Sequence, residues 1–319
     1  IMAVPTNTRE TYGAIGIRED LSNIIYNISP EETPFMSAIG KSSADNTFFE
    51  WQTDSLSSAA TNRVAEGDDA SVIAVSEPTR RGNYTQISAK AVQTSGTAEA
   101  VDFAGRKSSQ AYQMAKRAKE LKLDMELMLL SNTGRAAGSS GSARATGGVG
   151  AWVQSNLENG TATASAADYG VTAPTAGSDK ACVEADIRSL MTTCWNAGAK
   201  PTVIMVPGNI KKKVSELSQS VSELRTTAND KSPAYVVAAV DIYVSDFGNL
   251  QLIPNRNMPA KTAYFLDYEY WDIAYLRPFA SHDLAKTGDS VSKQLIVEYG
   301  LRARNEAANG SILGWDPAL

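Results

Sequence analysis

The sequence predicts an α+β fold, and three observations lead to that class. An amphipathic pattern over residues 105–132 indicates one long helix, and runs rich in aromatic and β-branched residues at 46–53 and 83–94 indicate strands. From residue 179 onward, helical and strand-like segments alternate, and a half-buried strand is predicted at 291–303. The length of 319 residues corresponds to about two domains.

Composition and charge exclude several classes of protein. Hydrophobic residues make up 43% and charged residues 20% of the chain, as in globular proteins, so a wholly disordered or collagen-like chain is excluded. The net charge of -5 lacks the basic excess of proteins that bind nucleic acid tightly. The longest apolar run, at 234–240, is far shorter than the ~20 residues of a membrane span, and the charged N-terminus lacks the apolar core of a secretory signal.

Residues 1–44 are predicted to form an extended N-terminal arm interrupted by short turns. Prolines divide this segment, and its apolar residues are too few to build a core of their own. These apolar residues must therefore dock on another surface, either the body of the same subunit or a neighbour. The apolar anchors of the arm are Ile24, Ile25, Tyr26, Phe35 and Met36.

A long polar segment, about residues 54–82, joins the first two predicted strands. Connections longer than about 12 to 15 residues usually have a function or are disordered, and an isolated two-stranded hairpin is only marginally stable in water. The hairpin is therefore expected to need a partner surface. Its charged residues are the candidate contact site, because opposite charges on a partner would add specificity. These candidates are Glu66, Asp68, Asp69, Arg80 and Arg81.

Residues 105–132 carry the clearest helical pattern in the sequence. Apolar residues recur every three or four positions, and most lysines and arginines fall away from that stripe. At 1.5 Å per residue the segment forms a rod of roughly 42 Å. The stripe is expected to pack beneath a sheet, so that Leu121→Asp would bury an unpaired charge and destabilise the protein. The stripe comprises Ala111, Met114, Ala118, Leu121, Met125 and Met128.

Small residues dominate 134–150 and 159–177, which are predicted to be flexible loops around the short segment 151–156. Beyond them, helices are expected at 179–197 and from about residue 209. Prolines and asparagines mark the turns between the later strands. The strands predicted in this part are 202–206, 235–244, 250–253, 262–266, 268–275 and 291–303.

The few cysteines and histidines restrict the chemistry of this chain. Cys182 and Cys194 would lie roughly 18 Å apart on the helix predicted at 179–197, too far for a disulfide, so both are expected to be free thiols. Two distant cysteines and the single histidine, His282, do not make a zinc site. A Ser-His-Asp or Cys-His mechanism would have to use His282, but no nucleophile motif such as G-x-S-x-G accompanies it. No catalytic, cofactor or metal site is predicted.

Three groups of short motifs accompany these elements. They are Asn83-Tyr84-Thr85-Gln86-Ile87 with Ser95-Gly96-Thr97-Ala98-Glu99-Ala100-Val101, then Arg144 with Gly147-Gly148 and Trp152, then Arg302-Ala303-Arg304-Asn305-Glu306-Ala307-Ala308-Asn309-Gly310. In these motifs, and in the order of its parts, the chain resembles the SU ten-like family of podophage major capsid proteins, which have the Hong Kong 97 type capsid fold. The similar parts cover nearly the whole chain.

This resemblance implies a division of the chain into the parts of that capsid fold. A long helix, called the spine, would lie in a peripheral domain, and an α/β axial domain would line the centre of each ring of subunits. The implied parts are an N-terminal arm at 1–44, an extended β-hairpin loop at 45–98, a peripheral domain at 99–179 and 284–319 with the spine helix at 105–132, and an axial domain at 180–283.

The resemblance also implies the function of a major capsid protein, which is a structural component of the virion and not an enzyme. Copies would assemble in the host cytoplasm, as hexamers and pentamers, into the icosahedral shell of a tailed phage. The shell would enclose double-stranded DNA, bound weakly and without sequence specificity, and the implied partners are a separate scaffolding protein and a portal protein. Replacing residues 57–82 by a short turn should then leave a folded subunit that cannot assemble. The alternatives are an encapsulin-like compartment enclosing an enzyme, and a cytosolic hydrolase that uses His282.

Overall fold

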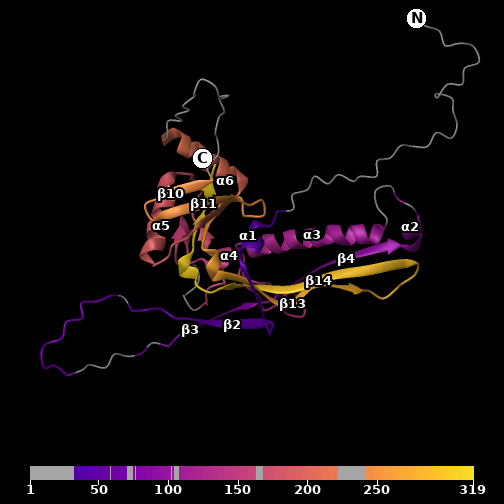
Figure 1. The fold of residues 1–319 in the computed structure, drawn as a ribbon, viewed down its shortest axis with the longest axis horizontal. Coiled ribbons are helices and arrows are strands. Elements are labelled where there is room, and N and C mark those ends of the chain that lie inside the picture. The colour runs from indigo at the N-terminus through magenta and orange to yellow at the C-terminus, as the bar shows by residue number, and fades with distance from the viewer. Residues whose placement is uncertain are drawn as a thin grey trace, which may run out of the picture.

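The chain folds around two β-sheets placed at different positions along an elongated molecule (Figure 1). The computed structural model describes residues 32–57, 59–69, 75, 77–101, 103, 108–162, 168–221 and 241–319. Helices and sheets are interleaved along the sequence, so the predicted α+β class is confirmed. Within these described ranges, no helix is both long enough and apolar enough to cross a membrane.

The first sheet contains four strands in the order β1-β13-β14-β4. β1 runs parallel to β13, whereas the other neighbouring strands are antiparallel. β13 begins later than the predicted strand 268–275, because residues Tyr268–Tyr270 form a short 3-10 turn. It also ends later and is longer, because it continues into the polar region beyond residue 275. The strands are β1 Gly40–Ser43, β13 Trp271–Asp283, β14 Ser290–Ala303 and β4 Gln86–Ser95.

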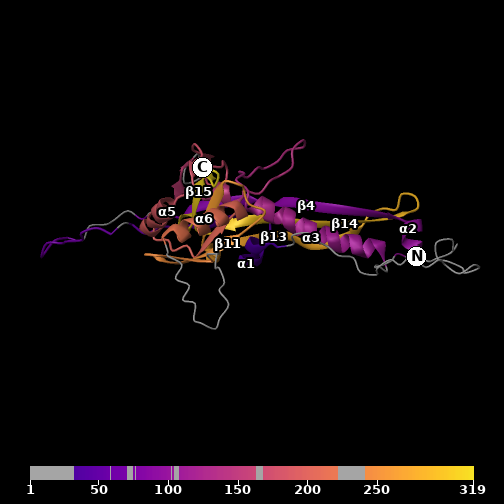
Figure 2. The same ribbon diagram turned by 90° about the horizontal axis from the view of Figure 1, so that it is seen from above.

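The long helix α3, Ser109–Leu129, lies along this sheet and packs against β4 and β14 (Figures 1 and 2). It has 21 residues and is shorter than the predicted helix 105–132. Ser108 has extended backbone angles, and its hydroxyl accepts a hydrogen bond from an N–H of the first turn, so the helix begins after this residue. Leu121 and Met125 are buried beneath the sheet, as the apolar stripe predicted.

The second sheet has six strands in the order β10-β11-β9-β12-β15-β5. Helices α5, Glu184–Asn196, and α6, Gly208–Val221, share an apolar cluster with one face of this sheet. The strands predicted at 202–206, 250–253 and 262–266 are confirmed here. The strands are β10 Ile242–Ser245, β11 Gly248–Pro254, β9 Val203–Val206, β12 Thr262–Leu266, β15 Gly310–Leu313 and β5 Leu157–Glu158.

The N-terminal arm docks on the body of its own subunit at residues 33–44. Phe35 and Met36 are buried in the main core, whereas the other predicted anchors, Ile24, Ile25 and Tyr26, lie outside the described residues, as does the predicted strand segment 235–240. The remaining short elements are α1 Pro34–Ala38, α2 Gly96–Ala100, α4 Val149–Trp152, the 3-10 turn Glu306–Ala308, and the strand pairs β6 Gly160–Thr161 with β7 Thr175–Ala176 and β8 Lys180–Ala181 with β16 Trp315–Asp316.

The prediction of one strand over residues 83–94 is wrong, because this segment belongs to two sheets. β3, Thr79–Tyr84, pairs with β2, Phe48–Thr53, and β4 then pairs with β14. The change of partner occurs at Thr85, whose N–H donates to the carbonyl of Thr47 (2.8 Å). Both segments are β-forming, so local sequence shows no break between them.

The prediction of a flexible loop at 134–150 is wrong for residues 146–150. Residues 146–153 are buried, and the glycines among them allow close backbone approach instead of mobility. A Cβ on Gly148 would lie 2.3 Å from the carbonyl oxygen of Ser131, and one on Gly134 would lie 1.8 Å from that of Val171. Composition shows that the residues of this segment are small, but it does not show that they are buried against other parts of the chain.

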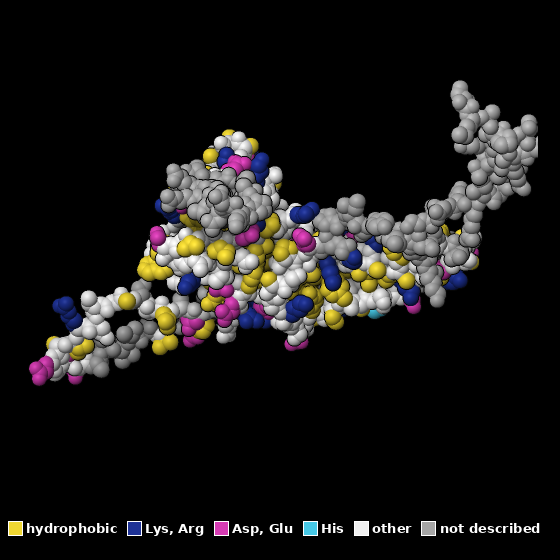
Figure 3. Space-filling model, turned by 45° about the horizontal axis from the view of Figure 1, so that its top comes forward, with side chains coloured by type: hydrophobic (Ala, Val, Ile, Leu, Met, Phe, Trp, Pro, Cys, Tyr) yellow, Lys and Arg dark blue, Asp and Glu magenta, His cyan; other side chains and the backbone are white. Residues whose placement is uncertain are grey.

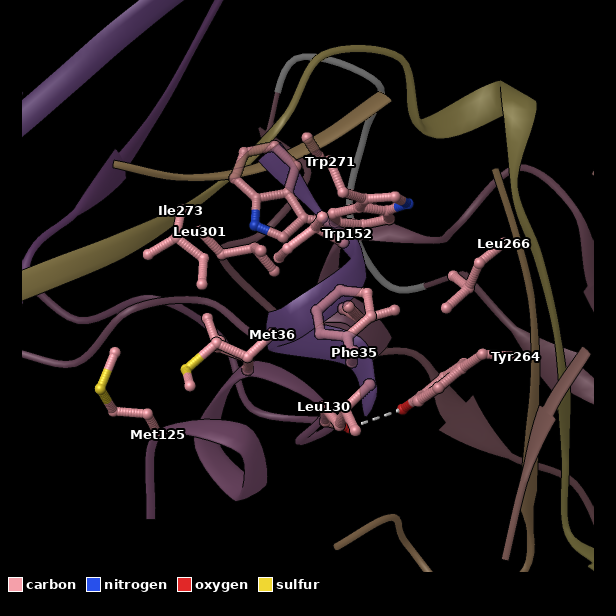
Figure 4. Packing of buried hydrophobic residues seen from close by; sticks show 14 of the residues in the cluster. Phe35, Met36, Met125, Leu130, Trp152, Tyr264, Leu266, Trp271, Ile273 and Leu301 are labelled. Carbon is pink, nitrogen blue, oxygen red and sulfur yellow. Dashed lines mark hydrogen bonds between the residues drawn. The ribbon is translucent and has the colours of Figure 1, made fainter. Parts of the chain in front are cut away.

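The main core lies where the two sheets, α3 and α4 meet (Figure 4). Phe35 of the arm makes an edge-to-face contact with Trp271, with ring centroids 6.3 Å apart. Trp152 is fully buried in the same cluster, and the hydroxyl of Tyr264 donates to the carbonyl of Leu130 (3.1 Å). The arm, the helix and both sheets therefore share one packed interior.

Both cysteines are free, as predicted, but the geometric reason differs, and both are buried. Helix α5 begins at Glu184, so Cys182 precedes the helix and only Cys194 lies on it. Burial raises the pKa of each thiol to about 12, against an ordinary value of 9.0.

We expect the native protein to resist thiol reagents that attack the thiolate. At pH 8 the thiolate fraction is roughly a thousandfold below that of an exposed cysteine, and burial slows access further. Titration with such a reagent should detect no fast thiol in the native protein and two after unfolding without a reductant. Finding fewer than two in the unfolded protein would contradict the absence of a disulfide.

Candidate intersubunit surface

A two-stranded arm and the loop that it carries protrude from the body of the subunit (Figures 1 and 2). β2 and β3 pair with each other in a sheet of their own, in the register Phe48↔Tyr84 to Thr53↔Thr79. Every described residue of the loop 54–78 is exposed. Two of its apolar side chains are almost fully in solvent, with Leu56 100% and Val75 90% exposed. Such a segment gains little from the fold of its own subunit.

The structure brings three of the predicted contact residues together at a turn in this loop. Glu66, Asp68 and Asp69 are exposed around Gly67, whose φ of 84° suits glycine. The N–H of Asp68 donates to the carbonyl of Ala65 (3.2 Å) and closes the turn. Residues 54–78 contain five acidic residues and one basic residue, so the loop presents a negative charge.

The other two predicted contact residues lie in β3 and not at the tip. Arg80 pairs with Glu50 across the arm at 2.5 Å. The guanidinium of Arg81 donates to the hydroxyl of Thr53 (3.1 Å) and lies 4.6 Å from the ring centre of Tyr169. Both arginines therefore make contacts within the subunit, and a role between subunits stays a prediction.

Aromatic rings and arginines hold the base of the arm against the body. The rings of Trp51 and Trp152 lie 5.2 Å apart, and the guanidinium of Arg135 lies 5.4 Å from the ring centre of Phe48. A Cβ on Gly82 would lie 2.5 Å from the ring of Phe48, so the two strands pack closely here. Because Arg135 is in a segment of small residues without periodicity, sequence reasoning missed it.

The motif asparagine Asn83 connects this arm to the first sheet and to the buried glycines. Its side-chain amide donates to the carbonyl of Leu301 (2.7 Å) and to the hydroxyl of Thr146 (3.0 Å). Its carbonyl oxygen accepts from the N–H of Gly147 (3.0 Å). Asn83 is fully buried, so these bonds satisfy polar groups that water cannot reach.

A buried carboxylate lies beneath the junction of β3 and β4. Glu298 is 3% exposed and pairs with Arg144 (2.7 Å) and Arg277 (2.7 Å), while the hydroxyl of Thr85 donates to it (2.9 Å). By the alternation of side chains along a strand, Glu298 lies on the face of β14 opposite the apolar Val297 and Tyr299. Tertiary packing covers that face, which periodicity cannot show.

Glu126 connects α3 with the N-terminal arm and with the end of β11. Its carboxylate accepts from the backbone N–H groups of Phe35 and Met36 (2.8 Å each) and from the side-chain amide of Asn255 (2.7 Å). Glu126 is fully buried. Burial raises the pKa of this carboxyl, against the lowering effect of the three hydrogen bonds.

We expect Glu126→Gln to reveal this raised pKa in the pH dependence of stability. A carboxyl whose pKa is raised on folding contributes stability that is complete below its ordinary pKa of 4.5 and lost as the pH rises through the folded-state value. The free energy of unfolding of the wild type, measured in urea relative to Glu126→Gln, should therefore fall as the pH rises above 4.5.

Glu120→Gln is the matched control on the same helix. The hydrogen bond from Arg117 lowers the pKa of Glu120, so the corresponding difference should fall as the pH decreases. Equal slopes for the two variants would contradict the assignment for Glu126.

His282 lies exposed on β13, in register with Gln294 of β14. No group of three or more His, Cys, Asp or Glu residues that could hold a metal occurs in the part of the chain that the structure describes.

The architecture is that of the subunits of phage capsids and related shells. The capsid asymmetric unit of cyanophage A-1(L) superposes with a TM-score of 0.67 at 14% identity and covers 94% of this chain and 97% of that one. The capsid protein of a native GTA particle gives a TM-score of 0.59 at 13% identity, covering 96% and 98%. The holo-SrpI encapsulin of Synechococcus elongatus PCC 7942 gives 0.56 at 10% identity, covering 95% and 94%. The predicted Hong Kong 97 type capsid fold is confirmed.

Sequence similarity defines the family. The profile of the family described as SU10 major capsid protein matches residues 4–316. The major capsid protein of Escherichia phage Phieco32 is 30% identical over 335 aligned positions, which cover 94% of this chain and 95% of that protein. The chain belongs to the SU10 major capsid protein family, and its function is that of a phage major capsid protein, which builds a shell from copies of itself. The encapsulin shares the fold alone.

Proposed function

We propose that this subunit tiles the icosahedral shell of a tailed phage by laying its loop 54–78 on an adjacent subunit. The observation that carries the proposal is the contrast between an exposed, acidic loop with bare apolar side chains and an arm fixed at its base by buried contacts. Because the β2–β3 arm is fixed at its base, less conformational entropy is lost when the loop binds. Burial of the loop's exposed apolar side chains on the adjacent subunit would add affinity. Contacts that run from one copy to the next in this way can close into rings.

The domain division proposed for this shell follows the ranges implied by the resemblance. The ranges are an arm at 1–44, an extended loop at 45–98, a peripheral domain at 99–179 and 284–319 and an axial domain at 180–283. Their support is the six-stranded sheet, four of whose strands lie within 180–283, and α3, which packs against β14. Five strands of the two large sheets do not follow these ranges: β1, β4 and β13 belong to the sheet beside α3, and β5 and β15 lie in the six-stranded sheet.

The proposed partners follow from the same function. Copies would form hexamers and pentamers, with a separate scaffolding protein during assembly in the host cytoplasm and a portal protein at one vertex. The enclosed double-stranded DNA would be bound weakly and without sequence specificity, which fits the net charge of -5. The subunit would have no catalytic role and no cofactor.

Electron microscopy and sedimentation of the full chain test this function. We expect closed shells or rings of five and six subunits when the chain is expressed alone or with its scaffolding protein. A protein that stays monomeric under both conditions would contradict the proposal. His282→Ala should assemble like the wild type, because the proposed function assigns no contact to its exposed side chain on β13. Loss of a hydrolytic activity in shells that still form would instead favour the hydrolase alternative.

A further inference from the structure

A groove of about 370 Å³ lies beside the point where the N-terminal arm meets the body. Its apolar part is formed by Met36 of α1 and by Tyr275 and Phe279 of β13, whose rings lie 6.3 Å apart. Phe279 is 40% exposed, so part of its ring remains open to a partner segment. The volume suits a few apolar side chains of a segment and is small for an entire helix.

Two lysines give this groove a positive rim. Lys41 of β1 and Lys122 of α3 line it and are both exposed. Neither forms an ion pair with any residue that the structure describes. The groove therefore combines an apolar floor with two available cations, and a matching segment would be apolar on one side and acidic.

The sequence just before the groove has this character. Four apolar residues follow the spacing i, i+3, i+4 and i+7, which is the spacing of one face of a helix: Leu21, Ile24, Ile25 and Ile28. The stretch 17–31 carries three acidic residues, at positions 19, 20 and 31, and one arginine. This stretch contains the predicted apolar anchors Ile24, Ile25 and Tyr26, for which no docking surface has yet been proposed.

We propose that the stripe Leu21, Ile24, Ile25 and Ile28 docks in the groove between α1, α3 and β13 of its own subunit, with the neighbouring acidic residues facing Lys41 and Lys122. Thr33 lines the groove, and Ile28 is five positions before it. Five residues span at most roughly 17 Å, so the stripe can reach the groove and cannot move far from it. A tether this short gives an effective concentration in the millimolar range, which favours the subunit's own segment over that of a second copy.

The contact would extend the anchoring that Phe35 and Met36 provide. Those two residues are held by the core and by the carboxylate of Glu126, so the described end of the arm is fixed beside the groove. Because the proposed contact lies within one subunit, it does not depend on how subunits are arranged in a shell.

Disulfide trapping in the full chain tests the proposal. The variant carrying Ile25→Cys and Phe279→Cys should form a bond within one chain on mild oxidation, seen as a linked peptide from a monomer band. Asn23→Cys with Phe279→Cys is the matched control, because position 23 lies off the stripe, and about tenfold less linkage is expected. The natural cysteines are buried and should not compete.

Other occupants give different products. Linkage between chains when the two single-cysteine variants are mixed would assign the groove to the arm of a second copy and overturn the proposal. Linkage of Val64→Cys with Phe279→Cys would assign it to the loop 54–78 and overturn it equally. Hydrogen exchange supplies an independent readout: Ile25→Asp should increase amide exchange at residues 36–41 and 275–280, and unchanged exchange together with absent linkage would refute the docking.

Discussion

Replacement of residues 54–78 by an Asn-Gly turn should abolish shell assembly and leave the subunit folded. The loop is exposed throughout its described residues and is absent from all three apolar clusters, so its removal costs the core little. Thr53 and Thr79 face each other across the arm, which is the spacing that a two-residue turn joins. What the variant loses is the acidic and apolar surface that we propose to lie on the next subunit.

Circular dichroism and thermal unfolding should report a native subunit, while light scattering and electron microscopy should detect no shells. The triple variant Glu66→Gln, Asp68→Asn and Asp69→Asn is the matched control of unchanged length. It should assemble more slowly and with weaker dependence on salt, because exposed charges affect association rate and specificity more than affinity. Shells of normal size from the shortened chain would refute the docking role of the loop.

The structure changes how this deletion has to be made. Removal of residues 57–82, as the sequence alone suggested, would delete Thr79–Gly82 of β3 and the contacts of Arg81 with Thr53 and Tyr169. An assembly defect in that variant could then result from loss of the β2–β3 pairing and not from loss of the loop. Keeping both strands separates the two causes.

The elements predicted most accurately are those whose pattern is local and complete. β12 at Thr262–Leu266 matches its predicted range, and α3 retains the predicted stripe through Leu121 and Met125. A helical repeat, or a short run of apolar and aromatic residues bounded by turn residues, can be recognised without knowledge of the packing partner. The ends of α3 were placed less well, because the cap at Ser108 decides where the helix starts.

What sequence could not show is the choice of partner. Residues 83–94 have one continuous β-strand pattern in the sequence. Before Thr85 they pair with β2, and after it they pair with β14. The sequence predicts the acidic residues of the loop as one cluster, but it groups Arg80 and Arg81 with them because chain proximity is the only guide it offers. Their partners, Glu50 and Tyr169, come from different parts of the chain.

Leu121→Asp should unfold or severely destabilise the subunit, whereas Leu127→Asp on the same helix should not. Leu121 is 1% exposed beneath the sheet, and Leu127 is 52% exposed. Both substitutions change helix propensity equally, so the difference between the variants isolates the cost of burying an unpaired carboxylate. That cost is expected to be about 4 kcal/mol or more, a large fraction of the stability of an ordinary domain.

The two variants should therefore separate clearly in thermal unfolding. A loss of about 4 kcal/mol corresponds to a decrease in Tm of roughly 6 °C in a protein of this size, whereas the exposed substitution should change Tm by about 1 °C or less. Because the core beneath α3 also holds Phe35 and Met36, the arm should become more accessible to protease in Leu121→Asp. Equal melting temperatures for the two variants would show that the stripe of α3 does not support the sheet above it.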